Sequence, residues 1–308
     1  MSTRKQAPLD KFEEVTSRII ALLEQGTKPW VKPWSVESGG FRNALTGHVY
    51  SGCNPLLCAI DSLMFGYSSQ QFVGAAQAKQ QGWKIRKGSK STWLLWAGTG
   101  SKTEADPDTG EEVRRFYSAA KWLQTFNLDC LDDSESSHKK PPESSESEGK
   151  PTPLPISAVG QFIESQKAQI TIGGCEAFYS PSLDRLAVPD PAVFSSIEAY
   201  YATVIHELSH WTGHPSRLDR DQSGSFASAS YAFEELIAEL GAAFCGDRLG
   251  IETDLENHAS YLDHWLERLR SDKKAFFKAA SQARKAADLL LVNAGLQASQ
   301  AEPIPQAA

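Results

Sequence analysis

The strongest constraint in this sequence is a pair of histidines four residues apart, in the stretch YATVIHELSHWTGHPSRL at residues 201–218. Positions i and i+4 lie on one face of an α-helix, so His206 and His210 can reach the same ion. Glu207 is rotated away from the pair, where a carboxylate can act on water without binding the ion. Apolar residues at helical spacing, followed by Gly213, favour a helix here. The pattern is H-E-x-x-H, the signature of zinc hydrolases in which the glutamate is the general base.

A catalytic zinc ion usually has three protein ligands and one open position, so a third donor is needed. The stretch YAFEELIAELGAAF at 231–244 predicts a second amphipathic helix that carries three glutamates. Glu235 and Glu239 share a face, whereas Glu234 lies about 100° away. We expect Glu235 to be the third ligand. We expect Glu239 to orient a ligand histidine by contacting it on the side away from the ion. The alternative is a solvated acidic face, which is common for paired glutamates.

Two further histidines, His214 and His258, follow the motif in the sequence. His214 is four residues after His210, but Gly213 is expected to end the helix first, so we rank His214 second as a ligand. His258 is a candidate for polarising a substrate carbonyl, although packing beside Tyr261 is the simpler interpretation. The alternative for the signature itself is a pair of core histidines satisfied by hydrogen bonds, and a third ligand decides between the two.

Charge and tryptophan are unevenly distributed along the 308 residues. Residues 1–130 contain 16 Lys and Arg against 12 Asp and Glu, a net charge of +4. The remainder holds the other 15 basic and 26 acidic residues, a net charge of −11, so the overall −7 conceals a basic first half. Six of the eight tryptophans lie in that half. Basic residues interleaved with aromatic rings are typical of surfaces that bind single-stranded DNA, because cations contact phosphates and rings stack on bases.

Two segments supply most of the candidate DNA contacts, namely TKPWVKPW at 27–34 and GWKIRKGSK at 82–90. The candidates are Trp30, Trp34, Arg42, Lys84, Arg86, Lys87 and Lys90. For the basic cluster at 84–90 the alternative is a merely solvated loop. Trp93 and Trp96 are expected to be core side chains, because residues three apart on a strand face opposite sides.

Several long segments resemble the plasmid-borne antirestriction proteins of the ArdC type. They are FYSPSLDRLAVPDPAVFSSIEAYYATVIHELSHWTGHPSRLDR, which also resembles part of a conjugative primase, then YAFEELIAELGAAF and ENHASYLDHWLERLRSDKKAFFKAASQARKAADLLL. RNALTGHVYSGCNPLLC and GWKIRKGSKSTWLLW resemble the amino-terminal domain of the same family. That family pairs a single-stranded-DNA-binding domain with a zinc-peptidase-like domain. The resemblance implies His206, His210 and Glu235 as metal ligands and Glu207 as the base.

The chain is expected to divide at residues 131–155, where Ser, Glu, Lys and Pro dominate and large apolar groups are rare. Such a segment buries too little surface to offset its ordering entropy, so it predicts a flexible linker or loop. We therefore expect a single-stranded-DNA-binding domain at 1–130, a zinc-metallopeptidase-like domain at 156–295 and a disordered tail at 296–308. The expected fold class is α+β, with a zincin-like C-terminal domain in which a small sheet adjoins the HExxH helix and the following glutamate-bearing helix.

Apolar periodicity and turn residues predict the individual elements. In chain order they are a helix at 10–25, a short helix near 70–81, a strand-rich region at 82–98, a hairpin with its turn at 104–112, a helix near 157–167, strands in QITIGG, AFYS and RLAVP, and helices near 194–212, 230–249, 254–270 and 273–291.

Five cysteines without any CxxC pairing predict reduced thiols in a cytoplasmic protein. No apolar run approaches 18 residues and the start MSTRKQAPLDKFEE has no apolar core, so we expect neither a membrane span nor a signal peptide.

The sequence thus predicts an antirestriction protein that binds single-stranded DNA and carries a metallopeptidase-like site for Zn²⁺, with another divalent ion such as Mn²⁺ as the alternative. A DNA-bound or restriction-system protein is the expected substrate. The rival hypothesis is a non-enzymatic protein that protects DNA by coating it and whose metal site is only structural. The enzyme needs Glu207, whereas both hypotheses need the three ligands.

Overall fold

The computed structural model of the chain describes residues 10–30, 40–105, 112–132, 156–224, 228–251, 253 and 262–296. The helices are α1 (Lys11–Glu24), α2 (Asn54–Phe65), α3 (Ala75–Gln80), α4 (Ile156–Ser165), α5 (Ile197–Trp211), α6 (Ala229–Leu249), α7 (Leu262–Ser271) and α8 (Ala275–Asn293), with 3₁₀ turns at Leu128–Cys130 and Pro191–Val193. The strands are β1 (Arg42–Asn43), β2 (Gln71–Gly74), β3 (Thr92–Ala105), β4 (Glu112–Asn127), β5 (Gln169–Ile172), β6 (Phe178–Ser180) and β7 (Arg185–Val188).

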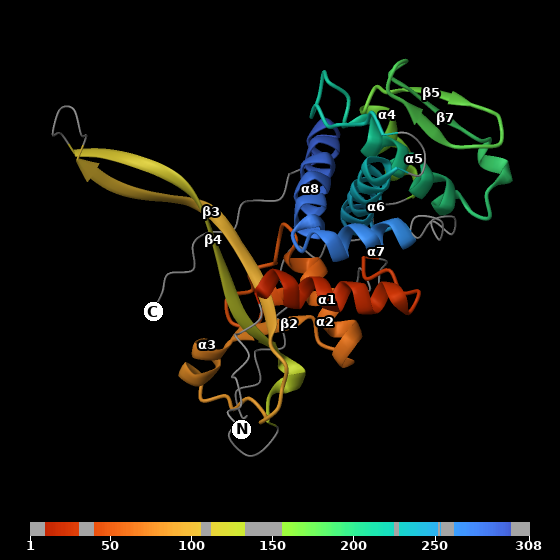
Figure 1. The fold of residues 1–308 in the computed structure, drawn as a ribbon. Coiled ribbons are helices and arrows are strands. Elements are labelled where there is room, and N and C mark those ends of the chain that lie inside the picture. The colour runs from red at the N-terminus through yellow and green to blue at the C-terminus, as the bar shows by residue number, and fades with distance from the viewer. Residues whose placement is uncertain are drawn as a thin grey trace, which may run out of the picture.

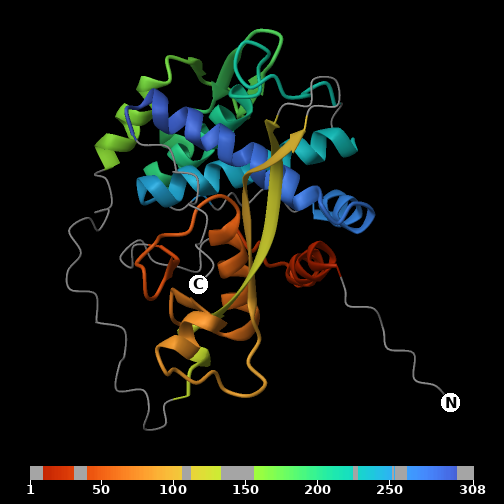
Figure 2. The same cartoon turned by 90° about the vertical axis from the view of Figure 1, so that its left-hand side faces the viewer.

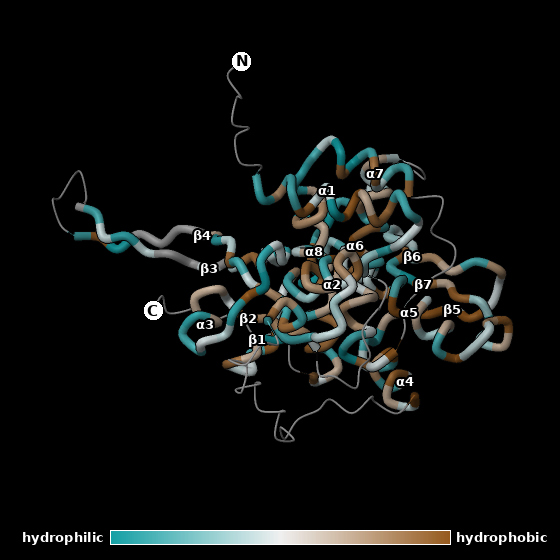
Figure 3. The backbone as a smooth tube through the Cα atoms, turned by 90° about the horizontal axis from the view of Figure 1, so that it is seen from below, coloured by the Kyte–Doolittle hydropathy of each residue, from teal (hydrophilic) through white to brown (hydrophobic). Residues whose placement is uncertain are grey.

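The first half of the chain is built around a four-stranded sheet in the order β1-β2-β4-β3. β3 and β4 pair antiparallel from Thr92 opposite Thr125 to Ala105 opposite Glu112, much further than the short strands beside them. The far part of this ribbon therefore projects away from the helices (Figure 1), and it is largely hydrophilic towards its tip (Figure 3). At its base, alternate side chains such as Leu94 and Trp96 point into the protein and are buried.

Helix α1 shares a core with the C-terminal helices, although it comes first in the chain. Its apolar stripe, which includes Ile19 and Leu23, belongs to the same buried cluster as Trp265 and Phe276 of α7 and α8. Figure 1 shows α1 lying below α7, and Figure 2 shows the first-half elements packed beneath the C-terminal helices. The expected domain boundaries at 130 and 155 remain a prediction. The packing shows that residues on both sides of them contribute to one core.

The second half places a small sheet beside a helical layer. The sheet has the order β5-β7-β6, and α5 packs against β6 and β7 through the face that includes Leu186 and Val188. On its other side α5 packs against α6. A Cβ atom on Gly241 of α6 would lie 2.9 Å from Ser209 Oγ of α5, so this glycine lets the two helices approach closely.

Most expected elements are present within the described residues, and the α+β class is confirmed. The segment near 70–81 is half strand, because β2 precedes α3, and residues 82–91 form mostly a loop before β3. The helix α2 was not predicted. The first part of the expected helix 254–270, the turn 106–111 and most of the linker lie outside the described residues. Within those residues, no helix is long and apolar enough to cross a membrane.

Candidate metal centre

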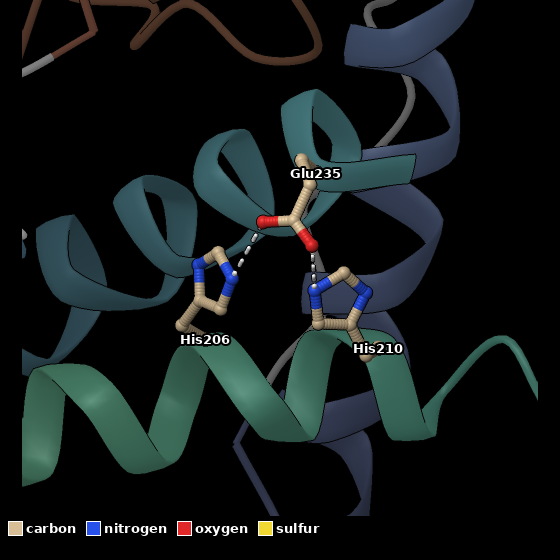
Figure 4. Close-up of side chains that lie close together, drawn as sticks. All are labelled: His206, His210 and Glu235. Atoms are coloured by element: carbon tan, nitrogen blue, oxygen red, sulfur yellow. Dashed lines mark ion pairs between the residues drawn. The ribbon is translucent and has the colours of Figure 1, made fainter. Parts of the chain in front are cut away.

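Two helices with well-defined starts carry the histidines and the glutamate of the site. Ser196 caps the start of α5, because its hydroxyl accepts a hydrogen bond from Ala199 N at 3.1 Å, and Ser228 caps α6 in the same way through Tyr231 N at 3.2 Å. The helical spacing brings the rings of His206 and His210 to a centroid separation of 4.9 Å. Figure 4 shows both rings rising from α5 with the Glu235 carboxylate of α6 between them.

The three donor groups fit one metal ion. Glu235 Oε2 lies 3.5 Å from His206 Nε2, and Glu235 Oε1 lies 3.4 Å from His210 Nε2. Ligand atoms about 2.0–2.2 Å from one ion at tetrahedral angles are roughly 3.4 Å apart. The three residues are well shielded, with exposed fractions between 3% and 9%. Two imidazoles and one carboxylate with this spacing are a typical ligand set of catalytic zinc sites.

Glu207, the expected general base, is a buried neighbour of His206 on α5. It follows His206 directly on α5, and its side chain is buried in the same region, with 7% exposed. A carboxylate shielded from bulk water has stronger electrostatic interactions with the groups around it than one at the surface. The donor set and the adjacent buried base together make hydrolytic chemistry feasible here.

The buried histidines and glutamates of the site interact strongly with one another. Burial alone would lower the pKa of His210, but hydrogen bonds with Glu234 and Glu235 outweigh it and raise the pKa to about 10. Burial alone would raise the pKa of Glu235, but its hydrogen bonds with His206 and His210 hold that pKa well below the usual range. A metal ion that binds His210 must therefore displace a proton.

Glu234 is a part of the site that the sequence reasoning missed. Its Oε1 lies 3.3 Å from His210 Nδ1, the ring nitrogen that faces away from Glu235. The sequence predicts that Glu239 contacts a ligand histidine, and that role of Glu239 stays a prediction. Glu239 is fully buried in α6, and its Oε1 lies 3.9 Å from Lys28 Nζ.

The other histidines do not join the cluster of ligands among the described residues. His214 lies beyond the end of α5, and its Nδ1 is 2.8 Å from Ser216 Oγ. This agrees with its lower rank as a ligand. His258 lies outside the described residues.

The candidate DNA contacts differ in their surroundings. Trp30 is 2% exposed, and its ring packs against Trp265 and Phe276 at centroid distances of 5.5 and 6.5 Å. The prediction that Trp30 stacks on bases is therefore wrong for this structure, because the ring is inside the core. Trp34 lies outside the described residues. The prediction that Trp93 and Trp96 are core side chains is confirmed, since Trp96 is buried and Trp93 packs against the main core.

The basic cluster forms an exposed turn between α3 and β3. Lys84, Arg86, Lys87 and Lys90 are all exposed on this turn. Lys84 Nζ lies 3.9 Å from Asp132 Oδ2. Arg86 donates to the carbonyls of Asp129 and Leu131, so part of its function is to fix the turn. Arg42 is half-buried in β1, and its Nε donates to Gly40 O at 3.3 Å. The turn is thus the most accessible basic surface among these candidates.

The chain matches two family models that together cover most of it. Residues 10–126 match the N-terminal domain of anti-restriction factor ArdC, and residues 157–282 match a zincin-like metallopeptidase. The first match indicates interaction with nucleic acid.

Curated relatives include proteins of very different lengths. Two DNA primases named TraC from Escherichia coli are each 34% identical over 301 residues, covering 91% and 92% of this chain. The chain spans only 27% and 20% of those primases. An uncharacterized protein, y4eC of Sinorhizobium fredii (strain NBRC 101917 / NGR234), is 34% identical over 293 residues, with 92% of each chain covered.

Solved structures extend the match to the whole fold. The metal-free antirestriction ArdC protein from the R388 plasmid is 36% identical with a TM-score of 0.74, covering 94% of this chain and 100% of that one. Its Mn(II)-bound structure is 34% identical with a TM-score of 0.73, covering 93% and 98%. The bound Mn(II) in that protein and the zincin-like match support a divalent metal for this fold. The chain therefore belongs to the ArdC family of antirestriction proteins, with an ArdC-type N-terminal region and a zincin-like metallopeptidase domain.

Proposed function

We propose that this antirestriction protein binds incoming single-stranded DNA in the cytoplasm and that its zincin-like domain hydrolyses peptide bonds with Zn²⁺ as cofactor. The observation that carries the proposal is that the possible ligand atoms of His206, His210 and Glu235 all lie within 4.8 Å of one another. Glu207, which follows His206 on the helix, is also buried. A protein that is bound to DNA or belongs to a restriction system is the expected substrate, because the DNA-binding part brings the peptidase close to it.

The chain's own residues divide the chemistry between them. His206, His210 and Glu235 would hold the ion, which when bound supplies Lewis acidity and lowers the pKa of water towards about 7. Glu207 accepts the proton of the attacking water as the carbonyl carbon is attacked. The same carboxyl group then donates that proton to the leaving amine. Removing such a general base typically slows the reaction by about 10²–10⁴-fold.

The DNA-binding part of the proposal rests on the exposed basic turn. Lys84, Lys87 and Lys90 are solvent-exposed cations on one short segment, and residues 1–130 carry a net charge of +4. Such a surface binds phosphates without reading sequence, which suits a protein that must act on any incoming strand.

A second candidate function is favoured by the same exposed turn. A protein that coats single strands protects them by occupancy, and in that case the metal site stabilises the fold without taking part in protection. The two functions differ in the need for Glu207, because coating requires the ligands and the basic turn but no base.

A conjugation assay into a restricting host separates the two functions. We compare the wild-type protein with Glu207→Gln, which keeps the size of the side chain but cannot accept a proton. The matched DNA variant is Lys87→Glu with Lys90→Glu, chosen because Arg86 also fixes the turn. Loss of protection in Glu207→Gln, with normal DNA binding and metal content, supports proteolysis. Full protection in Glu207→Gln and none in the double lysine variant supports coating.

A further inference from the structure

The imidazole of His210 is held from both sides by neighbouring glutamates. Its Nε2 faces Glu235 Oε1 at 3.4 Å, and its Nδ1 faces Glu234 Oε1 at 3.3 Å. A carboxylate at Nδ1 requires the hydrogen to be on that nitrogen when the ring is neutral, which leaves the lone pair on Nε2. Glu234 therefore directs the coordinating nitrogen of His210 towards Glu235, provided that Glu234 itself stays in place.

Arg220 fixes Glu234 by a two-point contact. Its Nε donates to Glu234 Oε2 at 3.0 Å, and its Nη2 donates to Glu234 Oε1 at 2.7 Å. This bidentate pairing fixes both the position and the plane of a carboxylate, which a lysine ammonium cannot do. The Arg220 side chain is only 5% exposed, so the pair is shielded from solvent.

The same guanidinium is anchored to the helix that carries His210. Arg220 Nη2 also donates to Ser209 O at 2.7 Å, and its Nη1 donates to Thr212 Oγ1 at 2.8 Å. Arg220 N donates to Gly213 O at 2.9 Å, which closes the loop after α5 back onto the helix end. Arg220 thus connects the end of α5 to the start of α6.

Gln222 adds a second connection, and Gly213 leaves the room for both side chains. Gln222 Nε2 donates to His210 O at 2.7 Å and to Glu234 Oε1 at 3.0 Å. A Cβ atom on Gly213 would lie 2.6 Å from Gln222 Nε2 and 2.9 Å from Arg220 Nη2. Any larger residue at 213 would displace these two side chains.

We propose that Arg220 is a positioning residue of the metal centre, which holds Glu234 against Nδ1 of His210 and so keeps Nε2 of that ring directed towards the ion. The inference rests on the metal site of the proposed function. Glu234 and Glu235 are consecutive, buried and nearly equidistant from His210, but they face different nitrogens of its ring. Arg220 contacts both oxygens of Glu234, whereas the oxygens of Glu235 face the two histidines.

The test is the Zn²⁺ affinity of the full-length protein, measured by competition with a chelator, together with the absorption spectrum of the protein loaded with Co²⁺. We expect Arg220→Gln to weaken Zn²⁺ binding by about 10–100-fold and to change the Co²⁺ spectrum, as the loss of an outer partner of a ligand typically does. Arg220→Lys should restore only part of the affinity, because a point charge cannot contact both oxygens.

The matched control is an arginine of the same loop that does not contact Glu234. Arg217 donates to Trp211 O at 2.6 Å and to Asp184, so Arg217→Gln removes a partly buried guanidinium that does not contact Glu234. This variant should keep the wild-type Zn²⁺ affinity and Co²⁺ spectrum. Gly213→Ala provides a second variant with every charge intact, and it should weaken Zn²⁺ binding in the same direction as Arg220→Gln. If Arg220→Gln does not fold, Gly213→Ala decides the test.

Three results would overturn the inference. The first is wild-type Zn²⁺ affinity and Co²⁺ spectrum in Arg220→Gln, or in Gly213→Ala, while His206→Ala loses the ion. The second is full recovery of affinity in Arg220→Lys, since charge alone would then suffice. The third is an equal loss in Arg217→Gln, which would show a general effect of the loop. A wild-type protein that binds no Zn²⁺ would instead contradict the proposed metal site itself.

Discussion

Replacing Trp30 with alanine should destabilise the C-terminal core, although residue 30 lies in the region that matches a DNA-associated domain. The ring is buried against Trp265 and Phe276. An aromatic side chain buries roughly 150–250 Å², which at about 25 cal/mol per Å² corresponds to about 4–6 kcal/mol. Measured tryptophan-to-alanine losses in cores are about 3–5 kcal/mol. The indole N–H has no hydrogen-bond partner among the described residues, so its removal adds no cost, and we expect about 3–4 kcal/mol.

The assay is urea unfolding followed by circular dichroism, paired with single-stranded-DNA binding under conditions where each variant is folded. Trp30→Phe should lose less stability than Trp30→Ala, because most of the packing remains. Lys87→Ala is the surface control and should change stability by less than about 0.5 kcal/mol. Unchanged stability in Trp30→Ala together with lost DNA binding would refute the reasoning and would return Trp30 to the DNA surface.

The remaining predictions concern the metal, the DNA and pH. Alanine at any of the three ligands should remove bound metal while Glu207→Gln keeps it, as metal quantification will show, and full metal content after loss of the glutamate ligand would contradict the assignment. Lys87→Ala and Lys90→Ala should each reduce the dependence of DNA affinity on salt by about 0.7 in the slope of log K against log salt, and equal slopes would exclude a phosphate contact. The hydrogen bond from Arg217 lowers the pKa of Asp184, so Asp184 stabilises the fold above its unfolded pKa near 3.8, and this stabilisation is lost as the pH falls through the folded value. Asp184→Asn should therefore be less stable than the wild type at neutral pH, with a difference that shrinks in acid, and a difference independent of pH would refute the linkage.

The metal-binding helices could be predicted because their constraints are local. Two histidines four residues apart restrict the segment to a helix if they are to share an ion, and Gly213 marks the end of that helix in the sequence. Glu235 and Glu239 of α6 are also four residues apart, so they too share one face of a helix. The fold adds the distance between the two helices, which only tertiary packing determines.

Helix α2 was missed because its burial is not periodic. Six consecutive residues from Leu56 to Asp61 are buried, so the helix has no alternation of apolar and polar faces from which a period can be read. Its remaining signals are Pro55 in the first turn and Gly66 after the last, and both also occur in turns.

The supporting contacts of the metal centre depend on a loop whose path has no sequence signature. Arg220 reaches Glu234 across 14 residues because the chain after α5 folds back on the helix end. Before that path is known, Glu234 is one of three glutamates on a helix and Arg220 is one of several arginines. Sequence reasoning therefore found the three residues that lie close together, His206, His210 and Glu235, and missed the contacts that support them.

The packing of α1 and the segment after it also determines how the two proposed activities can be separated experimentally. Trp30 lies in the C-terminal core, and Lys28 Nζ lies 3.9 Å from Glu239 Oε1, one helical turn from Glu235 of the candidate metal centre. A fragment ending near residue 130 would expose the apolar stripe of α1, and a fragment starting there would lose the packing beside the metal-binding helix. Truncation at the expected boundary would thus damage both halves. Point substitutions at Glu207 and on the basic turn keep the shared core intact, and so they can assign DNA binding and hydrolysis to their own residues.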